Sequence, residues 1–181
     1  MQYENVNTPE ELLEFMDSIE YGFISDEGEK FSGDNPEEFS ENIMFWHLSS
    51  PERLLKTRIG HCFDQVELER LWFKSHGYIF KTFLTIFMIE EKNDYPTHTF
   101  LAYEDNSKWK LFEHADYFNR GICEYATLEE LIEVVKKRQI LFAEVSDDIG
   151  KKLGVFEYDT PEYGIGFQEF IDYVVDSGEI A

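Results

Sequence analysis

The chain of 181 residues predicts an α+β fold, in which helices lie beside an antiparallel sheet. Capped amphipathic helix patterns occur near both ends of the chain. The middle, from 78 to 113, is instead rich in β-branched and aromatic residues, with turn residues between the runs. The length suits one domain, and no linker or internal repeat divides it, so we expect a single domain over 1–181.

The first part of the chain is predicted to be mainly helical. Thr-Pro-Glu-Glu at 8–11 is a helix start with a capping Thr, and apolar residues continue this helix to about 19. Residues 25–42 are rich in Gly, Asp, Glu, Asn and Ser and predict a long acidic loop, a type of segment that often carries function. Ser-Ser-Pro-Glu at 49–52 caps a short helix, and Gly60 then breaks the chain.

The remaining elements alternate between helix and strand. Residues 78–89 give the strongest strand signal, because β-branched and aromatic side chains fill them. Thr-Leu-Glu-Glu at 127–130 is a capping box that starts another helix. The other expected elements are a helix over 63–75 that Gly77 ends, a connection over 91–96, a strand over 97–104, a hairpin loop over 104–108, a strand over 108–113 and a final helix over about 167–176.

The charge of the chain is strongly negative. Its 16 Lys and Arg residues against 38 Asp and Glu give a formal net charge of −22. Such a surface repels nucleic-acid phosphates and anionic membranes and favours basic or neutral partners. We therefore expect no nucleic-acid or membrane partner, and a peptide or protein amide substrate, including a basic protein, as the binding partner.

Cysteine usage and the N-terminus indicate a cytoplasmic protein. The two cysteines, Cys62 and Cys123, belong to no Cys-x-x-Cys pair, and no secretory or membrane-spanning segment is visible. In a reducing cytoplasm both thiols are expected to be free. A disulfide between them is the alternative, and it would leave Cys62 without a free thiol to react.

Cys62 lies where an amphipathic helix begins, directly after a glycine turn. At a helix N-terminus the unpaired backbone N–H groups and the dipole favour an anion, so this thiol should ionise readily. His98 and Glu113 follow downstream in predicted strands. A thiol, an imidazole and an acid in this order are typical of a nucleophile with an oriented base, with Asp116 as an alternative acid to Glu113.

A thiol nucleophile also needs groups that stabilise the oxyanion of its intermediate. The backbone N–H of Cys62 is the natural first donor, because it points out of the helix end. The second donor is expected to be a side chain from upstream, and the sequence leaves three candidates open: Tyr21, Trp46 and His47.

Two further residues are expected to line this site, His61 and Trp109, although packing is the simpler role for Trp109. His47, His61 and Cys62 are residue types that bind metals, but their spacing does not suit a metal site. No Cys or His pair has zinc-like spacing, and adjacent residues are a poor chelate. We therefore predict no metal and no cofactor.

The stretch from about 60 to 121 resembles the core of the transglutaminase-like superfamily, papain-like thiol enzymes that include transglutaminases, bacterial cysteine peptidases, deamidases and peptide N-glycanases. Its motifs are a Gly-x-Cys at a helix start, a strand with His followed by an aromatic, and a Trp-x-x-x-Asp strand. Here these correspond to 60–62, to His98 with Phe100, and to Trp109 with Glu113. The resemblance implies a helix with the nucleophilic Cys packed on a sheet that carries His and acid.

The resemblance covers about a third of the chain and departs from the family pattern at two points. The acid is Glu113 rather than Asp, and Phe100 stands where many members have Trp directly after His. The implied roles are nucleophile for Cys62, base for His98 and orienting acid for Glu113. We therefore expect a cysteine peptidase, amidase or transglutaminase-like enzyme, with hydrolysis favoured over amine transfer. The alternative is a non-catalytic acidic module of the same fold that docks a basic protein.

Overall fold

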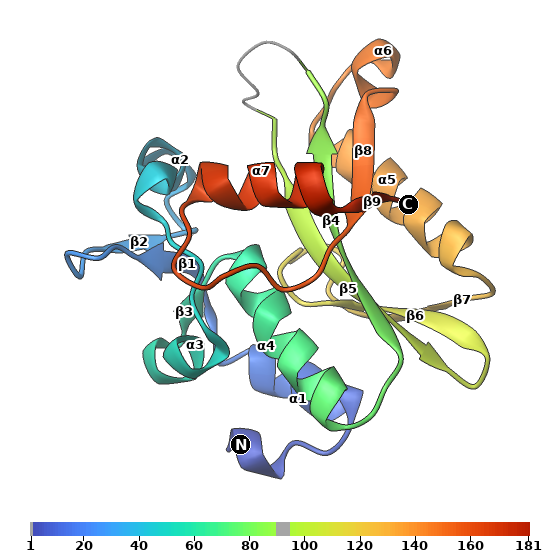
Figure 1. Cartoon of the computed structure of the whole chain (residues 1–181), viewed down its shortest axis with the longest axis horizontal. Coiled ribbons are helices and arrows are strands. Elements are labelled where there is room, and N and C mark those ends of the chain that lie inside the picture. Colours follow the sequence, from blue (N-terminus) through green and yellow to red (C-terminus); the bar gives the residue numbers. More distant parts are fainter. Residues whose placement is uncertain (1, 90–94) are drawn as a thin grey trace.

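The computed structural model describes residues 2–89 and 95–181 and has an α+β fold, as predicted. Within these residues it contains seven α-helices and a six-stranded antiparallel sheet in the order β7-β6-β5-β4-β8-β9 (Figure 1). A second sheet, β2-β1-β3, lies near the N-terminal helices. None of the helices in the described ranges is long and apolar enough to cross a membrane.

The helices are α1 (Pro9–Met16), α2 (Pro36–Asn42), α3 (Pro51–Thr57), α4 (Cys62–Ser75), α5 (Leu128–Phe142), α6 (Asp147–Gly150) and α7 (Phe167–Ser177), with 3-10 turns η1 (Tyr3–Asn5) and η2 (Ile43–Phe45). The strands are β1 (Glu20–Ile24), β2 (Lys30–Ser32), β3 (Ile59–Gly60), β4 (Phe80–Phe87), β5 (His98–Asp105), β6 (Lys108–Glu113), β7 (Gly121–Tyr125), β8 (Leu153–Glu157) and β9 (Glu179–Ile180). Residues 91–94 of the expected connection lie outside the described residues.

Three predicted helix starts are confirmed by their capping geometry. The hydroxyls of Thr8, Ser50 and Thr127 each accept the backbone N–H three residues later, at 3.2 Å in every case. Each cap satisfies an N–H that has no partner within its own helix, which is why Ser and Thr before an apolar run predict a helix so well.

The predicted long loop over 25–42 was wrong. Residues 30–32 form β2, which pairs with β1, and residues 36–42 form α2. Pro36 opens α2, and acidic residues fill its first turn, which is the same signal that identified α1. Phe31 is buried in the core next to Phe23, at 4.9 Å between ring centroids, so this acidic segment is tied down by apolar contacts.

The strands β4, β5 and β6 were predicted and form the centre of the large sheet. Asn106 and Ser107 join β5 to β6 with φ angles of 53° and 62°, the left-handed conformation that a two-residue hairpin requires. Strands β1, β3, β7, β8 and β9 were not predicted, because each is only two to five residues long. Among them β8 matters most, because it pairs with β4 along five residues.

The two faces of the large sheet bury different clusters, as the alternation of strand side chains requires. One face packs on α5, and its strand residues include Phe83, Phe100 and Leu111. The other face lies under α1, α4 and α7, and its strand residues include Leu84, Leu101 and Phe112. Helix α4 therefore lies over the middle of the sheet, with α5 on the opposite side (Figure 1).

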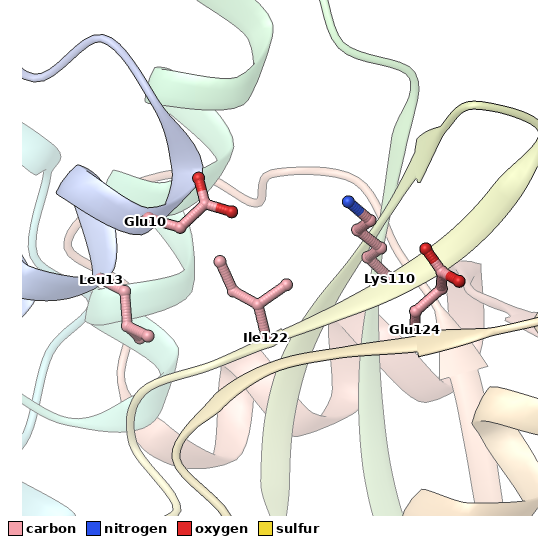
Figure 2. Close-up of a pocket in the computed structure, with 5 residues that line it drawn as sticks. All are labelled: Glu10, Leu13, Lys110, Ile122 and Glu124. Carbon is pink, nitrogen blue, oxygen red and sulfur yellow. The ribbon is translucent and has the colours of Figure 1, made fainter.

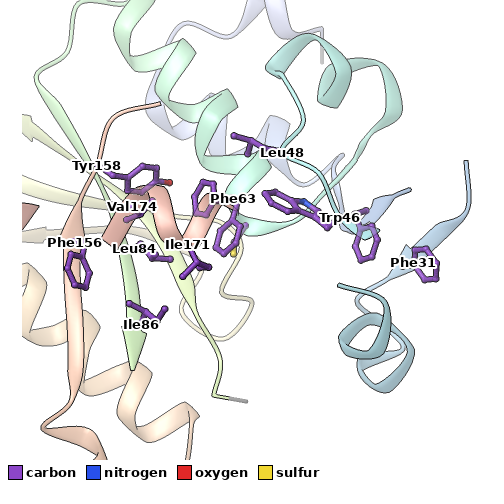
Figure 3. Close-up of a cluster of buried hydrophobic side chains, with 13 residues drawn as sticks. Phe31, Trp46, Leu48, Phe63, Leu84, Ile86, Phe156, Tyr158, Ile171 and Val174 are labelled. Atoms are coloured by element: carbon purple, nitrogen blue, oxygen red, sulfur yellow. The ribbon is translucent and has the colours of Figure 1, made fainter. Parts of the chain in front are cut away.

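The cluster between α4 and α7 holds the start of α4 in place. Phe63, the second residue of α4, stacks on Phe170 of α7 at 4.3 Å between centroids and meets the edge of Trp46 at 5.4 Å. Figure 3 shows this cluster, with Phe63 and Trp46 close to the α7 side chains Ile171 and Val174. Cys62 belongs to the same cluster, so aromatic packing fixes the position of its backbone.

Candidate active site

Cys62, His98 and Glu113 lie at one end of the sheet. Cys62 is the first residue of α4, His98 is the first residue of β5, and Glu113 is the last residue of β6. Because β5 and β6 are antiparallel, the start of one lies beside the end of the other. We call this end of the sheet, together with the first turn of α4, the rim.

Within the rim, two buried side chains, Gln65 and His114, join the first turn of α4 to the end of β6. The amide of Gln65 donates to the Gly60 carbonyl at 2.9 Å, and its oxygen accepts from His114 Nδ1 at 2.7 Å. His114 directly follows Glu113, just beyond the end of β6, and its partner is Gln65, whereas that of Glu113 is His98. Burial, together with the Arg120 charge, lowers the pKa of His114 to about 4, so it is a neutral structural residue.

His98 is hydrogen-bonded to Glu113 rather than to the alternative acid Asp116. The distance from His98 Nε2 to Glu113 Oε2 is 2.7 Å, and Glu113 is only 4% exposed. The second oxygen of Glu113 accepts the backbone N–H of Asp116 at 2.8 Å. The Asp116 carboxylate itself accepts the backbone N–H groups of Phe118 and Asn119, so it stabilises the turn after β6.

The thiol and the imidazole shift each other toward their charged forms. Burial alone raises the pKa of the Cys62 thiol, but the charge of His61 and the hydrogen bond and charge of His98 outweigh it and hold that pKa well below its usual value. Burial alone lowers the pKa of His98, but the charge of Glu113 and the hydrogen bond with Cys62 raise it well above its usual value. Both shifts favour a thiolate beside an imidazolium over a neutral pair.

Tyr21 is the one oxyanion candidate whose side chain interacts with Cys62. Burial, and then the charge of Cys62, hold the pKa of the Tyr21 phenol well above its usual value. The hydroxyl therefore keeps its proton at neutral pH and can act as a hydrogen-bond donor beside the sulfur.

The other two oxyanion candidates are engaged elsewhere. The indole N–H of Trp46 donates to Asp64 Oδ2 at 2.9 Å, and an indole has only that one donor. His47 Nδ1 lies 3.5 Å from Asp26 Oδ2, and the backbone of His47 forms an isolated bridge to the segment before α7. Of the three open candidates the structure therefore favours Tyr21, because the Trp46 donor is used by Asp64 and His47 faces Asp26.

Of the two residues expected to line the site, His61 does so and Trp109 does not. His61 is 5% exposed, and its Nδ1 lies 3.4 Å from Cys62 Sγ. Trp109 lies four residues before Glu113 on β6, about 13 Å along the strand, and packs against the cluster beneath α5. The packing role is the one that the structure gives to Trp109.

Asp64 has a role at the site that the sequence did not reveal. Besides the Trp46 indole, its carboxylate accepts the backbone N–H of Ser49 at 2.7 Å and of His61 at 2.8 Å. Burial raises the pKa of Asp64 to about 6 in spite of these donors. The carboxylate therefore fixes the segment before α3 to the residues beside the thiol.

Two more carboxyl groups of α4 are buried, those of Glu67 and Glu69. Glu67 is fully buried, with an ion pair to Arg70 at 3.3 Å, and Glu69 is 2% exposed. Burial raises the pKa of Glu67, and burial together with the Glu113 charge raises the pKa of Glu69 well above its usual value. The reason is that the sheet and other parts of the chain enclose the first two turns of α4 on all sides, which helical periodicity cannot predict.

A hollow of about 440 Å³ lies away from the rim and is lined by Glu10, Leu13, Lys110, Ile122 and Glu124. Figure 2 shows these side chains projecting from α1 and from strands β6 and β7 into the space between them. We call this hollow the α1 groove. Cys62, in contrast, is 1% exposed, and both cysteines of the described chain are free thiols.

Comparison with known proteins does not identify a family for this chain. No protein-family model matches it, and a search of curated proteins found no match. Within residues 2–89 and 95–181, no group of three or more His, Cys, Asp or Glu side chains is arranged to hold a metal ion. The function is therefore inferred from the geometry and charge of the rim.

Proposed function

We propose that this chain is a thiol-dependent acyl-transfer enzyme that acts on an amide or peptide bond, with Cys62 as nucleophile, His98 as base and Glu113 as orienting acid. The observation that carries the proposal is the position of His98, which is hydrogen-bonded to Glu113 at 2.7 Å and interacts with the Cys62 thiol. A nucleophile, a base and a group that orients the base are the three parts that such catalysis needs.

In the first step the Cys62 thiolate attacks the carbonyl carbon, and a carbon–sulfur bond forms as the carbonyl oxygen becomes negative. The His98 imidazolium then gives its proton to the amide nitrogen, the carbon–nitrogen bond breaks, and the amine leaves. The product on the enzyme is an acyl-thioester. Two donors suit the oxyanion: the backbone N–H of Cys62, which needs no acceptor within the helix, and the Tyr21 hydroxyl.

In the second step neutral His98 takes a proton from water, and the hydroxide attacks the thioester carbon. The carbon–sulfur bond breaks, a carboxylic acid leaves, and the thiolate–imidazolium pair is restored. An amine in place of water would give transamidation. Hydrolysis is the favoured outcome, because amine transfer requires a site that excludes water.

We further propose that the unit formed by α4 and strands β4 to β6 is a transglutaminase-like core. The support is the chain order of its parts, with a thiol at a helix start, a histidine at a strand start and an acid at the end of the next strand. Glu113 in place of Asp is compatible with this proposal, because its longer side chain still reaches His98.

The test is the rate of alkylation of Cys62 by iodoacetamide as a function of pH, read by peptide mass spectrometry with Cys123 as the internal reference. The lowered thiol pKa predicts labelling that persists well below the ordinary thiol midpoint near pH ~8.5. The midpoint is the quantity to compare, because burial of Cys62 slows labelling at every pH. A midpoint at the ordinary value in the wild type would overturn the proposal.

Release of nitrophenolate from p-nitrophenyl acetate gives a second readout, because acylation of the thiol liberates the dye. Cys62→Ala should abolish this burst while the circular dichroism spectrum stays unchanged, and Cys123→Ala should leave the burst intact. The burst rate should rise with pH as Cys62 loses its proton and level off well below pH ~8.5. A Cys62→Ala protein with full activity would contradict the proposed nucleophile.

The second candidate function is a non-catalytic acidic module that docks a basic protein. Two observations favour it: the net charge of −22, and the burial of Cys62, which is 1% exposed. This function predicts association that weakens steeply between low and high salt and is unchanged in Cys62→Ala. The alkylation midpoint separates the two candidates, because a docking module has no need of a low-pKa thiol.

A further inference from the structure

His61 touches the Cys62 sulfur, yet the proposed triad gives it no role. Its Nδ1 lies 3.4 Å and its Nε2 3.9 Å from Sγ. An in-line N–H···S hydrogen bond would leave the second ring nitrogen roughly 2 Å farther away than the first, because the two nitrogens lie on opposite sides of the ring. The nearly equal distances instead place the sulfur over the face of the imidazole.

The His61 ring is held in this position by aromatic side chains from several elements. Phe39 of α2 stacks on it at 5.4 Å with an interplanar angle of 18°, and Phe63 of α4 meets it edge-on at 4.5 Å. Tyr21 of β1 and Trp46 also contact it, at 5.4 Å and 6.0 Å between centroids. These four side chains form an aromatic box that fixes the His61 ring over the sulfur. The box leaves the ring little room to turn an N–H toward the sulfur.

This geometry favours an electrostatic role over proton transfer. The positive charge of an imidazolium is spread over its ring, so it attracts a thiolate from the face as well as from the edge. Proton transfer, in contrast, requires a donor in line with its acceptor. His98 has the orienting carboxylate that a base requires, whereas the contacts of the His61 ring are mainly with other rings.

We propose that His61 is a further catalytic residue, a face-on imidazolium that stabilises the Cys62 thiolate while His98 alone transfers protons. The inference rests on the proposed function, because it assigns a role in the same acyl transfer. It also extends the family resemblance, since it makes the residue directly before the nucleophile part of the charge pair.

The titratable groups that face this pair come from every element packed against it. They are Tyr21 on β1, Asp64 and Glu69 on α4, His98 on β5 and Glu113 on β6. A pH profile of one variant alone would mix their effects. The test therefore compares variants in which only the charge of one ring is removed.

The experiment measures iodoacetamide labelling and the nitrophenyl ester burst from low to high pH in wild type, His61→Phe and His98→Ala. His61→Phe keeps an aromatic ring in the box and removes its charge. We expect its labelling midpoint to rise by about 1 pH unit or more, with about tenfold slower labelling below the wild-type midpoint. At alkaline pH both the ester burst and the steady-state turnover of His61→Phe should approach those of wild type, whereas the steady-state turnover of His98→Ala should stay slow at every pH, because deacylation requires a base.

Two controls keep the outcomes distinct. His76→Phe makes the same exchange at the far end of α4, where His76 stacks on Trp72, and should leave the midpoint unchanged. His61→Gln repeats the test if the Phe variant unfolds. An unchanged labelling midpoint in a folded His61 variant would overturn this inference. Faster labelling at all pH values would also overturn it, because the ring would then only shield the thiol from the reagent. An ordinary midpoint in wild type would instead overturn the proposed function.

Discussion

The rim and the α1 groove differ in how their charged groups are surrounded. In the rim, Cys62 and Glu113 are buried, His98 is mostly buried, and the thiol and the imidazole shift each other's pKa. In the groove, Lys110 pairs with Asp105 at 2.6 Å, and Lys108 pairs with Glu124 beside it, with side chains that remain partly in water. The groove is the more open space, but the rim has the interacting titratable groups.

The difference has a simple physical origin. Water screens the charges of the groove, and exposed ion pairs of this kind typically contribute only 0–1 kcal/mol. In the rim little water is present, so each charge acts strongly on its neighbours and reactive protonation states become stable at neutral pH. An open hollow is therefore a weaker guide to chemistry in this molecule than a closed cluster of matched groups.

His98→Ala should give the largest effect that separates the two regions. It removes the base from the rim, so we expect a loss of about 10²–10⁴ in the steady-state rate of nitrophenyl ester hydrolysis, because deacylation requires a positioned group that takes a proton from water. The steady-state phase that follows the burst in a stopped-flow experiment measures this loss. A His98→Ala protein with a steady-state rate within threefold of wild type would move the active site away from the rim.

Glu113→Gln should have a smaller effect on the same readout. The amide keeps the size of the side chain but cannot hold a positive imidazolium, so we expect about a 10- to 100-fold loss, a part of the contribution of His98. Asp116→Asn is the matched control and should change the rate less than twofold, because its carboxylate stabilises a turn. Equal losses in both variants would mean that the turn, rather than the bond to His98, supports catalysis.

Asp64→Ala tests whether the rim depends on its buried hydrogen bonds. It leaves the donors of Trp46, Ser49 and His61 without their acceptor, so we expect a loss of about 2–4 kcal/mol in the free energy of unfolding at pH 7. Urea denaturation measures it. Asp116→Ala, at a partly exposed turn, should cost less than about 1 kcal/mol.

The pH dependence of the Asp64 effect has a defined sign. The pKa of Asp64 is about 6 in the folded chain, whereas an unperturbed Asp has 3.8. Between about pH 4 and 6, Asp64 therefore holds a proton in the folded chain that it has lost in the unfolded chain. The contribution of Asp64 to stability is then greatest below about pH 4 and decreases as the pH rises through 6. The gap between wild type and Asp64→Ala should widen as the pH falls from 7, and a gap that narrows would contradict the assigned pKa.

Of these variants, Lys110→Ala should change stability and Cys62 reactivity the least. Its side chain pairs with Asp105 at the edge of the α1 groove, where solvent reaches both groups, so we expect a loss of at most about 1 kcal/mol in stability. The labelling midpoint of Cys62 should not move. A shift in that midpoint would show that the groove and the rim act on each other, and the contrast between them would no longer hold.

The sequence by itself determined the features that depend on short-range signals. The caps of α1, α3 and α5, the hairpin turn at 106–107 and the position of Cys62 at a helix start all follow from residues within a few positions of one another. The same signal also marks the start of α2, so the predicted loop there was an error of interpretation. Local geometry and backbone capping are satisfied within one turn, which makes them readable in the chain itself.

Only the tertiary structure decided which side chains meet. The bond between Gln65 and His114 joins residues 49 positions apart, and the choice of Glu113 over Asp116 depends on where β6 ends relative to β5. The engagement of Trp46 by Asp64, the burial of Glu67 and Glu69, and the His61 ring over the sulfur follow in the same way from the enclosure of α4. Burial and charge interaction depend on how the elements pack, and a linear pattern of residues does not contain that arrangement.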